Sequence, residues 1–87
     1  MFQIFYTAEA QDRLGEIAKG DPKSARIIFE HIRKLPQTYR SDPLLKGEHF
    51  KGLRRNRIGR YRFIYRVVER ERKIHIVTID YRKSIYD

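Results

Sequence analysis

The sequence predicts an α+β domain: an N-terminal strand, then a helical hairpin packed on one face of a small, mostly antiparallel sheet, and a short C-terminal tail. Two observations carry this prediction. Apolar residues recur at helical spacing in the first part of the chain, and from residue 53 onward they alternate with arginine at the period of two that is typical of strands. The 87 residues fit a single domain, residues 1–87.

The chain is expected to begin with a strand over residues 2–6, FQIFY. Thr7 is then expected to cap a helix from Ala8 to about Lys19, because its hydroxyl can accept a hydrogen bond from an amide that has no partner within the helix. Gly20 is expected to end this helix.

Asp21 and Pro22 predict the start of a second helix, as its cap and its first residue, and Pro36 is expected to end it. Its apolar stripe consists of Ala25, Ile28, Phe29, Ile32 and Leu35. The turn between the two helices is very short, so they should form an antiparallel hairpin. Such a hairpin needs the face of a sheet to cover its apolar side.

The connection over residues 37–52, QTYRSDPLLKGEHFKG, is predicted to be a long loop, because it is polar and holds Pro43 and two glycines. Leu44 and Leu45 are expected to tuck against the edge of the core. Compact domains rarely use a loop of this length without a functional reason or local mobility.

Two strands joined by a tight turn at residues 58–60 are predicted next, over about residues 53–69. The alternation in the second strand places an aromatic and aliphatic set on one face: Tyr61, Phe63, Tyr65 and Val67. Arginines occupy the other face. After a turn at residues 70–72, a last strand over residues 73–80 has Ile74 and Ile76 on one face and Val77 and Ile79 on the other, a pattern typical of a central strand.

The formal net charge of +9 at pH 7 indicates an anionic partner: a phosphate polymer, an acidic protein or an anionic membrane surface. No apolar run is long enough for a membrane span, and the N-terminus lacks the pattern of a signal peptide, so a cytoplasmic protein is expected. The chain has no cysteine, and its histidines, His31, His49 and His75, lack metal-ligand spacing. We therefore expect a site without metal or cofactor.

Arginine with aromatic residues is a combination suited to RNA. Guanidiniums bind phosphates through paired hydrogen bonds, and aromatic rings stack on bases. RNA cleavage needs no metal, since the 2′-hydroxyl can attack the neighbouring phosphate when fixed cations stabilise the developing charge. Arginine stays protonated, so such a site would act by bending the substrate and neutralising charge.

Residues 44–67, LLKGEHFKGLRRNRIGRYRFIYRV, resemble the signature of the RelE/ParE toxin superfamily: a leucine-lysine-glycine loop, an arginine-rich strand, a Gly-x-Tyr-Arg turn and an aliphatic-Tyr-Arg-Val strand. The tail, IDYRKSIYD, is similar to the Arg-x-x-x-Tyr ending of the family. The order of predicted elements matches as well, so the resemblance covers nearly the whole chain. It implies a fold similar to that of microbial ribonucleases.

The RelE branch implies the toxin of a type II toxin–antitoxin pair that cleaves mRNA on the ribosome without metal, and an acidic antitoxin as partner. By this resemblance Arg62 and Arg82 would hold the scissile phosphate, with Arg55 and Tyr86 completing the catalytic set. RNA-binding candidates are Arg57, Arg54, Lys51 and Arg60. Leu53 stands at a position that is often basic in relatives. Some relatives also use a Glu and His pair, absent here from the matching turn and tail, so acid–base roles stay open.

Two alternatives remain open. The ParE branch inhibits DNA gyrase by binding it and lacks the tail residues, and a third reading is a toxin-like domain that binds RNA or its partner without catalysis. Structural roles also compete with functional ones. Arg62 could pair with Asp80, His75 could be packed in its strand, Tyr86 could anchor the tail, and Arg54 and Arg66 could be scaffold or partner contacts.

Overall fold

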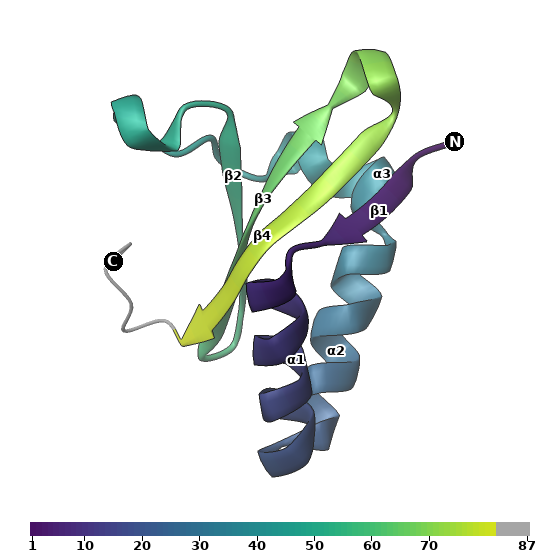
Figure 1. Cartoon of the computed structure of the whole chain (residues 1–87), viewed down its shortest axis with the longest axis vertical. Helices are drawn as coiled ribbons and strands as arrows, with labels where there is room; N and C mark the ends of the chain where they lie inside the picture. Colours follow the sequence, from purple (N-terminus) through teal and green to yellow (C-terminus); the bar gives the residue numbers. More distant parts are fainter. Residues whose placement is uncertain (82–87) are drawn as a thin grey trace.

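A computed structural model describes residues 1–81 of the chain. Its helices and strands follow the predicted order and confirm the α+β fold (Figure 1). Three single turns of 3-10 helix, Tyr39–Ser41, Glu48–Phe50 and Glu69–Glu71, lie in the connections. The main elements are β1 (Gln3–Tyr6), α1 (Ala8–Gly20), α2 (Pro22–Arg33), α3 (Leu35–Thr38), β2 (Leu53–Ile58), β3 (Tyr61–Val68) and β4 (Lys73–Tyr81).

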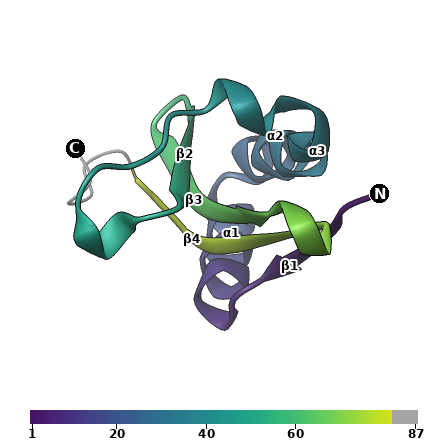
Figure 2. The same cartoon turned by 90° about the horizontal axis from the view of Figure 1, so that it is seen from above.

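The four strands form one mixed sheet in the order β1-β4-β3-β2. β1 runs parallel to β4, and the pairs β3–β4 and β2–β3 are antiparallel. Viewed from above, α2 and α3 lie on one side of the strands, and the segment around residues 48–50 projects on the other (Figure 2). The strand predicted to be central, β4, is indeed flanked on both edges.

Both helix starts follow the predicted capping chemistry. The Thr7 hydroxyl accepts a hydrogen bond from the Ala10 amide at 3.0 Å, and the Asp21 carboxylate accepts one from the Ser24 amide at 3.2 Å. Pro22 occupies the first turn of α2, where a missing N–H costs nothing. The short turn at Asp21 thus holds α1 and α2 as a hairpin.

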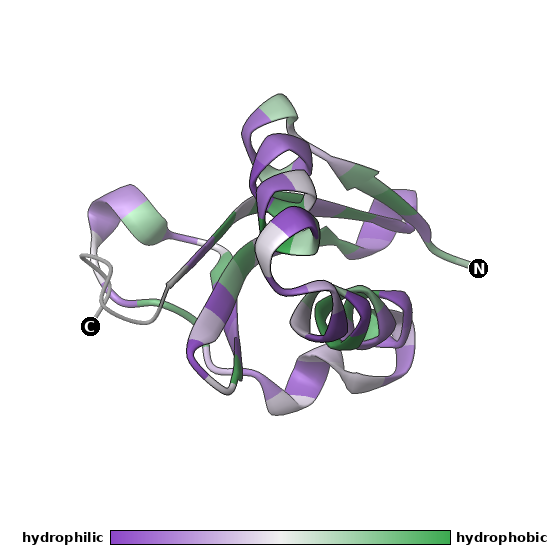
Figure 3. Cartoon of the chain, turned by 90° about the horizontal axis from the view of Figure 1, so that it is seen from below, coloured by the Kyte–Doolittle hydropathy of each residue, from purple (hydrophilic) through white to green (hydrophobic). Residues whose placement is uncertain are grey.

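The core lies between this hairpin and one face of the sheet. Hydrophobic residues gather on the strands, and hydrophilic ones on the outer turns and connections (Figure 3). The core face predicted for β3 is confirmed. The buried cluster comprises Ala10, Ile28, Ile32, Leu35, Tyr39, Tyr61, Phe63, Tyr65, Ile74, Ile76 and Ile79.

Three local expectations were wrong. Phe29 is 48% exposed, because it follows Ile28 by one residue and so lies about 100° around the helix from the buried stripe. Pro36 does not stop the helical path; it sits in the first turn of α3, where proline is tolerated. Leu44 is 56% exposed, since it pairs with Arg54 at the outer edge of β2.

A bulge in β4 corrects a fourth expectation. Ile64 pairs with Thr78 and Tyr65 with Ile76, which leaves Val77 as an extra residue. The extra residue reverses the alternation of side chains beyond it. Ile79 therefore joins Ile76 in the core instead of facing the other side.

No helix within residues 1–81 is both long enough and apolar enough to cross a membrane.

Candidate functional site

The face of the sheet opposite the core cluster carries the arginines of β2 and β3, and we call it the arginine face. The pairing register sets its composition: every residue that pairs with a core residue points to the core, and its neighbours point the other way. Its members are Leu53, Arg55 and Arg57 on β2, Arg62, Ile64 and Arg66 on β3, His75, Thr78 and Asp80 on β4, and Phe5 on β1.

Arg62 is the most enclosed residue of this face. Its side chain is fully buried, and it is the largest fully buried side chain in the described chain. In the register it lies between Arg57 on β2 and Asp80 on β4. The Asp80 carboxylate also receives the Arg13 guanidinium of α1 at 3.0 Å. A buried guanidinium loses its hydration, and hydrogen-bonding or charged groups around it must compensate for that loss. Such groups hold the guanidinium of Arg62 in one position.

Arg55 and Arg57 are the more accessible arginines of β2. Arg57 is exposed and lies directly opposite Arg62. Arg55 is half-buried and lies opposite Ile64, and its Nε has no hydrogen-bond partner among the described residues. Like charges directly opposite one another in a sheet repel, and a bound anion relieves that repulsion. The end of the arginine face around Arg57 and Arg62 therefore favours an anion such as a phosphate.

The remaining site candidates lie elsewhere. Arg54 points to the core side, where its Nη1 donates to the carbonyls of Asp42 at 2.8 Å and Tyr39 at 3.3 Å. Arg60 is exposed in the β2–β3 turn, and Lys51 is exposed in the connection before β2. Arg82 and Tyr86 lie outside the described residues. The structure thus brings Arg55, Arg57 and Arg62 together and separates Arg54 from them.

Arg60 borders a cavity of about 460 Å³ between the end of α1, the β2–β3 turn and the end of β4. Charges of both signs line it: Arg13, Glu16, Asp21, Arg60 and Asp80. Hydrogen bonds from the side chain and backbone of Ser24 hold the pKa of Asp21 below its usual value. This mixture does not favour an anion as clearly as the arginine face does.

Sequence reasoning missed a polar cluster that fixes β2. The Asp42 carboxylate accepts hydrogen bonds from the Tyr65 hydroxyl at 2.5 Å and from the Asn56 amide at 2.9 Å and 3.1 Å. Burial and the bond to Asp42 raise the pKa of Tyr65 well above its usual value, so the hydroxyl stays a donor. His31 of α2 meets Asn56 at 3.3 Å. The available signal was Asn56, a polar residue at a core-facing position of an arginine strand.

A second missed feature lies at the far end of the arginine face. The rings of Phe5 and His75 stack at 5.3 Å with an interplanar angle of 19°. Arg66 lies opposite His75, and the Lys73 ammonium lies 5.8 Å from the centre of the Phe5 ring. The alternation of Phe5 with the half-buried Ile4 and Tyr6 was the signal that could have placed its ring on this face.

Within residues 1–81 there is no group of three or more His, Cys, Asp or Glu side chains that could hold a metal ion. The arginine face carries guanidiniums, one carboxylate and the Phe5–His75 pair.

Solved toxin structures share this fold. The toxin–antitoxin complex RelBE2 from Mycobacterium tuberculosis matches with a TM-score of 0.79 and 20% identity, covering 93% of this chain and 98% of the other. The YoeB/ParE toxin from Agrobacterium tumefaciens has the same score and identity over 92% and 98%. The isolated Escherichia coli RelE toxin matches with 0.72 and 10% identity over 97% and 87%.

A sequence comparison with curated proteins gave no match. The family model of the ParE toxin of the type II toxin–antitoxin system parDE matches residues 4–86, which is almost the whole chain. This match agrees with the shared fold and with the signature in residues 44–67. The chain therefore belongs to the ParE toxin family of type II toxin–antitoxin systems, within the RelE/ParE superfamily.

Proposed function

We propose that this toxin is an mRNA endoribonuclease that acts on the ribosome without a metal ion. The observation that carries the proposal is the grouping of Arg55, Arg57 and Arg62 on one face of the sheet, with Arg57 directly opposite the buried Arg62. Two guanidiniums at neighbouring positions match the paired oxygens of one phosphate. A rigid sheet holds them in place, as charge stabilisation in a transition state requires.

The reaction breaks one bond and forms one. The 2′-oxygen of a ribose attacks the adjacent phosphorus, the bond from phosphorus to the 5′-oxygen of the next nucleotide breaks, and a 2′,3′-cyclic phosphate and a 5′-hydroxyl result. A proton leaves the 2′-hydroxyl and a proton reaches the departing 5′-oxygen. Arg57 binds the phosphate oxygens, the buried Arg62 opposite it adds positive charge that stabilises their extra negative charge, and Arg55 holds a flanking phosphate. Arg82 and Tyr86 of the tail remain part of the proposed set.

The partners follow from the same charge distribution. An acidic antitoxin covers the arginine face and blocks the RNA, and the structures of related toxins in complex with antitoxins support such a partner. The toxin acts in the cytoplasm, where mRNA and ribosomes are.

The test is induced expression followed by primer extension on cellular mRNA. We expect cuts within codons and an arrest of translation. Arg57→Ala is the first variant to compare, because Arg57 is exposed and its loss should leave the fold intact. Lys19→Ala, which removes an exposed positive charge at the end of α1, is the matched control and should retain activity. Full cleavage by Arg57→Ala would contradict the site assignment.

Inhibition of DNA gyrase is the second candidate, because the family model that matches residues 4–86 is that of ParE toxins. In that case the purified toxin blocks gyrase supercoiling, and induction causes a DNA-damage response with intact mRNA. Running the gyrase assay beside primer extension separates the two activities. A toxin-like domain without catalysis would give neither signal.

A further inference from the structure

We propose that Phe5 and His75, flanked by Lys73 and Arg66, form a base-stacking subsite for single-stranded RNA at the far end of the arginine face. This proposal rests on the proposed function and deepens it, because it says where RNA continues beyond the scissile phosphate. The set of four residues comes from three strands, β1, β3 and β4, and only the pairing register brings it together. We call it the aromatic shelf.

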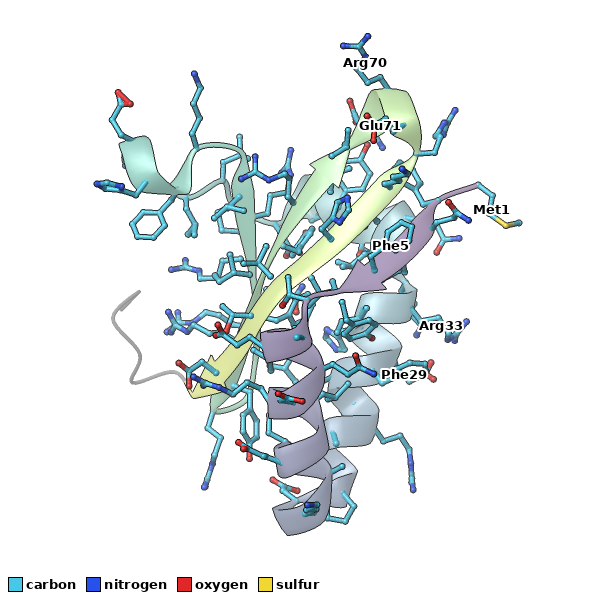
Figure 4. All side chains as sticks on the ribbon, in the orientation of Figure 1. Met1, Phe5, Phe29, Arg33, Arg70 and Glu71 are labelled. Atoms are coloured by element: carbon cyan, nitrogen blue, oxygen red, sulfur yellow. The ribbon has the colours of Figure 1, made fainter. Side chains whose placement is uncertain are left out.

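The Phe5 ring is partly open to solvent and is held in place by a neighbouring ring. Phe5 is 41% exposed although it is a large apolar side chain, and β1 is the edge strand of the sheet. His75 stacks against the ring at 5.3 Å and fixes its orientation. Phe5 lies on β1 and Phe29 on α2, and both border a pocket along β1 (Figure 4). An exposed, oriented ring of this kind suits a nucleobase, which has a flat apolar face.

One cation lies at the ring, and a second lies two strands away on the same face. Lys73 lies 5.8 Å from the ring centre, and it also pairs with Glu71 at 3.7 Å on the turn side. Arg66 is exposed and lies opposite His75, with its guanidinium against Gly52 of the connection. Aromatic rings alternating with cations are the combination that single-strand binders use.

The shelf lies at a useful distance from the proposed reaction centre. Arg62 and Arg66 are four residues apart on β3, and β1 lies two strands from β3, so Phe5 is about 15–20 Å from the Arg57–Arg62 end. This span is several times the size of one nucleotide. A short oligonucleotide at Arg57 therefore cannot reach Phe5, whereas a longer strand can.

An acidic segment of a protein partner is the competing occupant of this face. Charge alone suits both, but the flat exposed ring beside the cations favours bases over carboxylates. RNA is therefore the occupant we infer, and loss of partner binding becomes an outcome of the test.

The experiment measures the affinity of purified toxin for fluorescent uridine oligonucleotides with 2′-O-methyl sugars, which bind without being cut. One probe is a dinucleotide and the other is long enough to cross the whole sheet. We expect Phe5→Ala to weaken binding of the long probe about tenfold and to leave the dinucleotide unchanged. Phe5→Tyr keeps a ring of the same shape and should restore the affinity.

Ile27→Ala is the matched control, because it removes an apolar side chain of α2 that is 40% exposed, close to the 41% of Phe5. Thermal unfolding of each variant checks that the fold is intact. The proposal is overturned when Phe5→Ala behaves as Ile27→Ala does, when it weakens both probes equally, or when it weakens binding of a co-purified antitoxin but not of RNA.

Failure of the proposed function looks different. In that case the wild-type protein binds neither RNA probe, or Arg57→Ala changes the affinity for neither RNA probe. Either result also refutes the aromatic shelf. If Arg57→Ala weakens both probes while Phe5→Ala weakens neither, the RNA site stands and only the shelf is wrong.

Discussion

Asp80 lies directly opposite Arg62 because Val77 is the extra residue of a bulge in β4. Without the bulge, the alternation that starts with Ile74 and Ile76 on the core face would place Asp80 on the core face as well. The bulge turns the carboxylate to the arginine face and brings Ile79 into the core instead. One backbone irregularity thus supplies the one acidic neighbour of the buried arginine in the sheet register.

Replacing Arg62 should destabilise the protein. Its side chain is fully buried, so Arg62→Ala leaves a large cavity, and we expect a loss of about 3 kcal/mol or more in the free energy of unfolding. Arg57→Ala removes an exposed guanidinium from the neighbouring strand and should cost about 1 kcal/mol or less. Denaturant unfolding of both variants measures the difference. Equal costs would mean that the guanidinium of Arg62 is held no more tightly than that of Arg57.

The burial of Arg62 affects how cleavage assays of the two variants are interpreted. A loss of cleavage in Arg62→Ala has a structural explanation as well as a chemical one, whereas the same loss in Arg57→Ala has only the chemical one. We therefore place Arg57 ahead of Arg62 as the first site variant.

Deleting Val77 should leave the protein folded. Without the extra residue, Ile76 and Thr78 become consecutive and the residues after them keep their partners on β3, so Ile79 stays in the core and Asp80 stays opposite Arg62. Inserting one alanine between Ile79 and Asp80 should instead unfold the protein, because it turns Asp80 to the core face, where a buried carboxylate without a partner costs several kcal/mol. Circular dichroism on heating compares the two variants. A deletion variant that unfolds would show that β4 cannot pair with β3 without the bulge.

The sequence predicted those parts of the fold that depend on neighbours along the chain. Thr7 and Asp21 cap their helices through residues three positions away, and the alternation around Phe63 is a local property of β3. The bulge at Val77 depends on which strands pair and in what register. The periodicity of the sequence within one strand does not indicate which strand pairs with it or in what register.

The same limit applies to the site. The alternation of residues in the sequence predicted Arg55 and Arg57 on one face of the sheet and Arg54 on the other. The pairing of β2 with β3 confirms this. It could not predict that Arg62 is buried, because burial depends on what lies over the strand. The bond between Asp42 and Tyr65 joins a loop to a strand 23 residues later, and nothing in either segment alone indicates it.

Gly52 should tolerate no side chain. Its φ of +80° is a conformation that side chains rarely adopt, and a Cβ there would lie 3.1 Å from Nη1 of Arg66. We expect Gly52→Ala to cost about 1–2 kcal/mol and to displace the Arg66 guanidinium, which weakens binding of the long RNA probe. Gly15→Ala in α1 meets no atom within 4 Å and should instead stabilise the protein by about 0.5–1 kcal/mol. Chemical denaturation gives both values, and a gain in stability from both substitutions would contradict the argument.

Asp42 should be the acidic residue whose loss most disturbs the connection before β2. Asp42→Ala leaves the buried Tyr65 hydroxyl and the Asn56 amide without their acceptor, so we expect a loss of about 2 kcal/mol or more. Asp12→Ala removes an exposed carboxylate from α1 and should change stability by about 0.5 kcal/mol or less. Tyr65→Phe tests the pair directly. The variant that carries both Asp42→Ala and Tyr65→Phe should lose less stability than the two single variants together. Full additivity of the two losses would show that the two groups do not interact.

Asp21 should make the helical hairpin sensitive to acid. Its hydrogen bonds to Ser24 lower its pKa in the folded state below the ordinary value of 3.8, so the unfolded state takes up a proton first. The contribution of the charged Asp21 cap to stability is complete above pH 3.8. It disappears as the pH falls through the lower pKa of the folded state. Asp21→Asn keeps a capping group without the charge, so its melting temperature should differ most from the wild type at neutral pH and converge with it in strong acid. Thr7→Ala removes a cap that does not titrate. The difference in melting temperature between this variant and the wild type should therefore not change with the protonation of Asp21. A constant difference between Asp21→Asn and the wild type across the acid range would show that the charge of this cap contributes nothing.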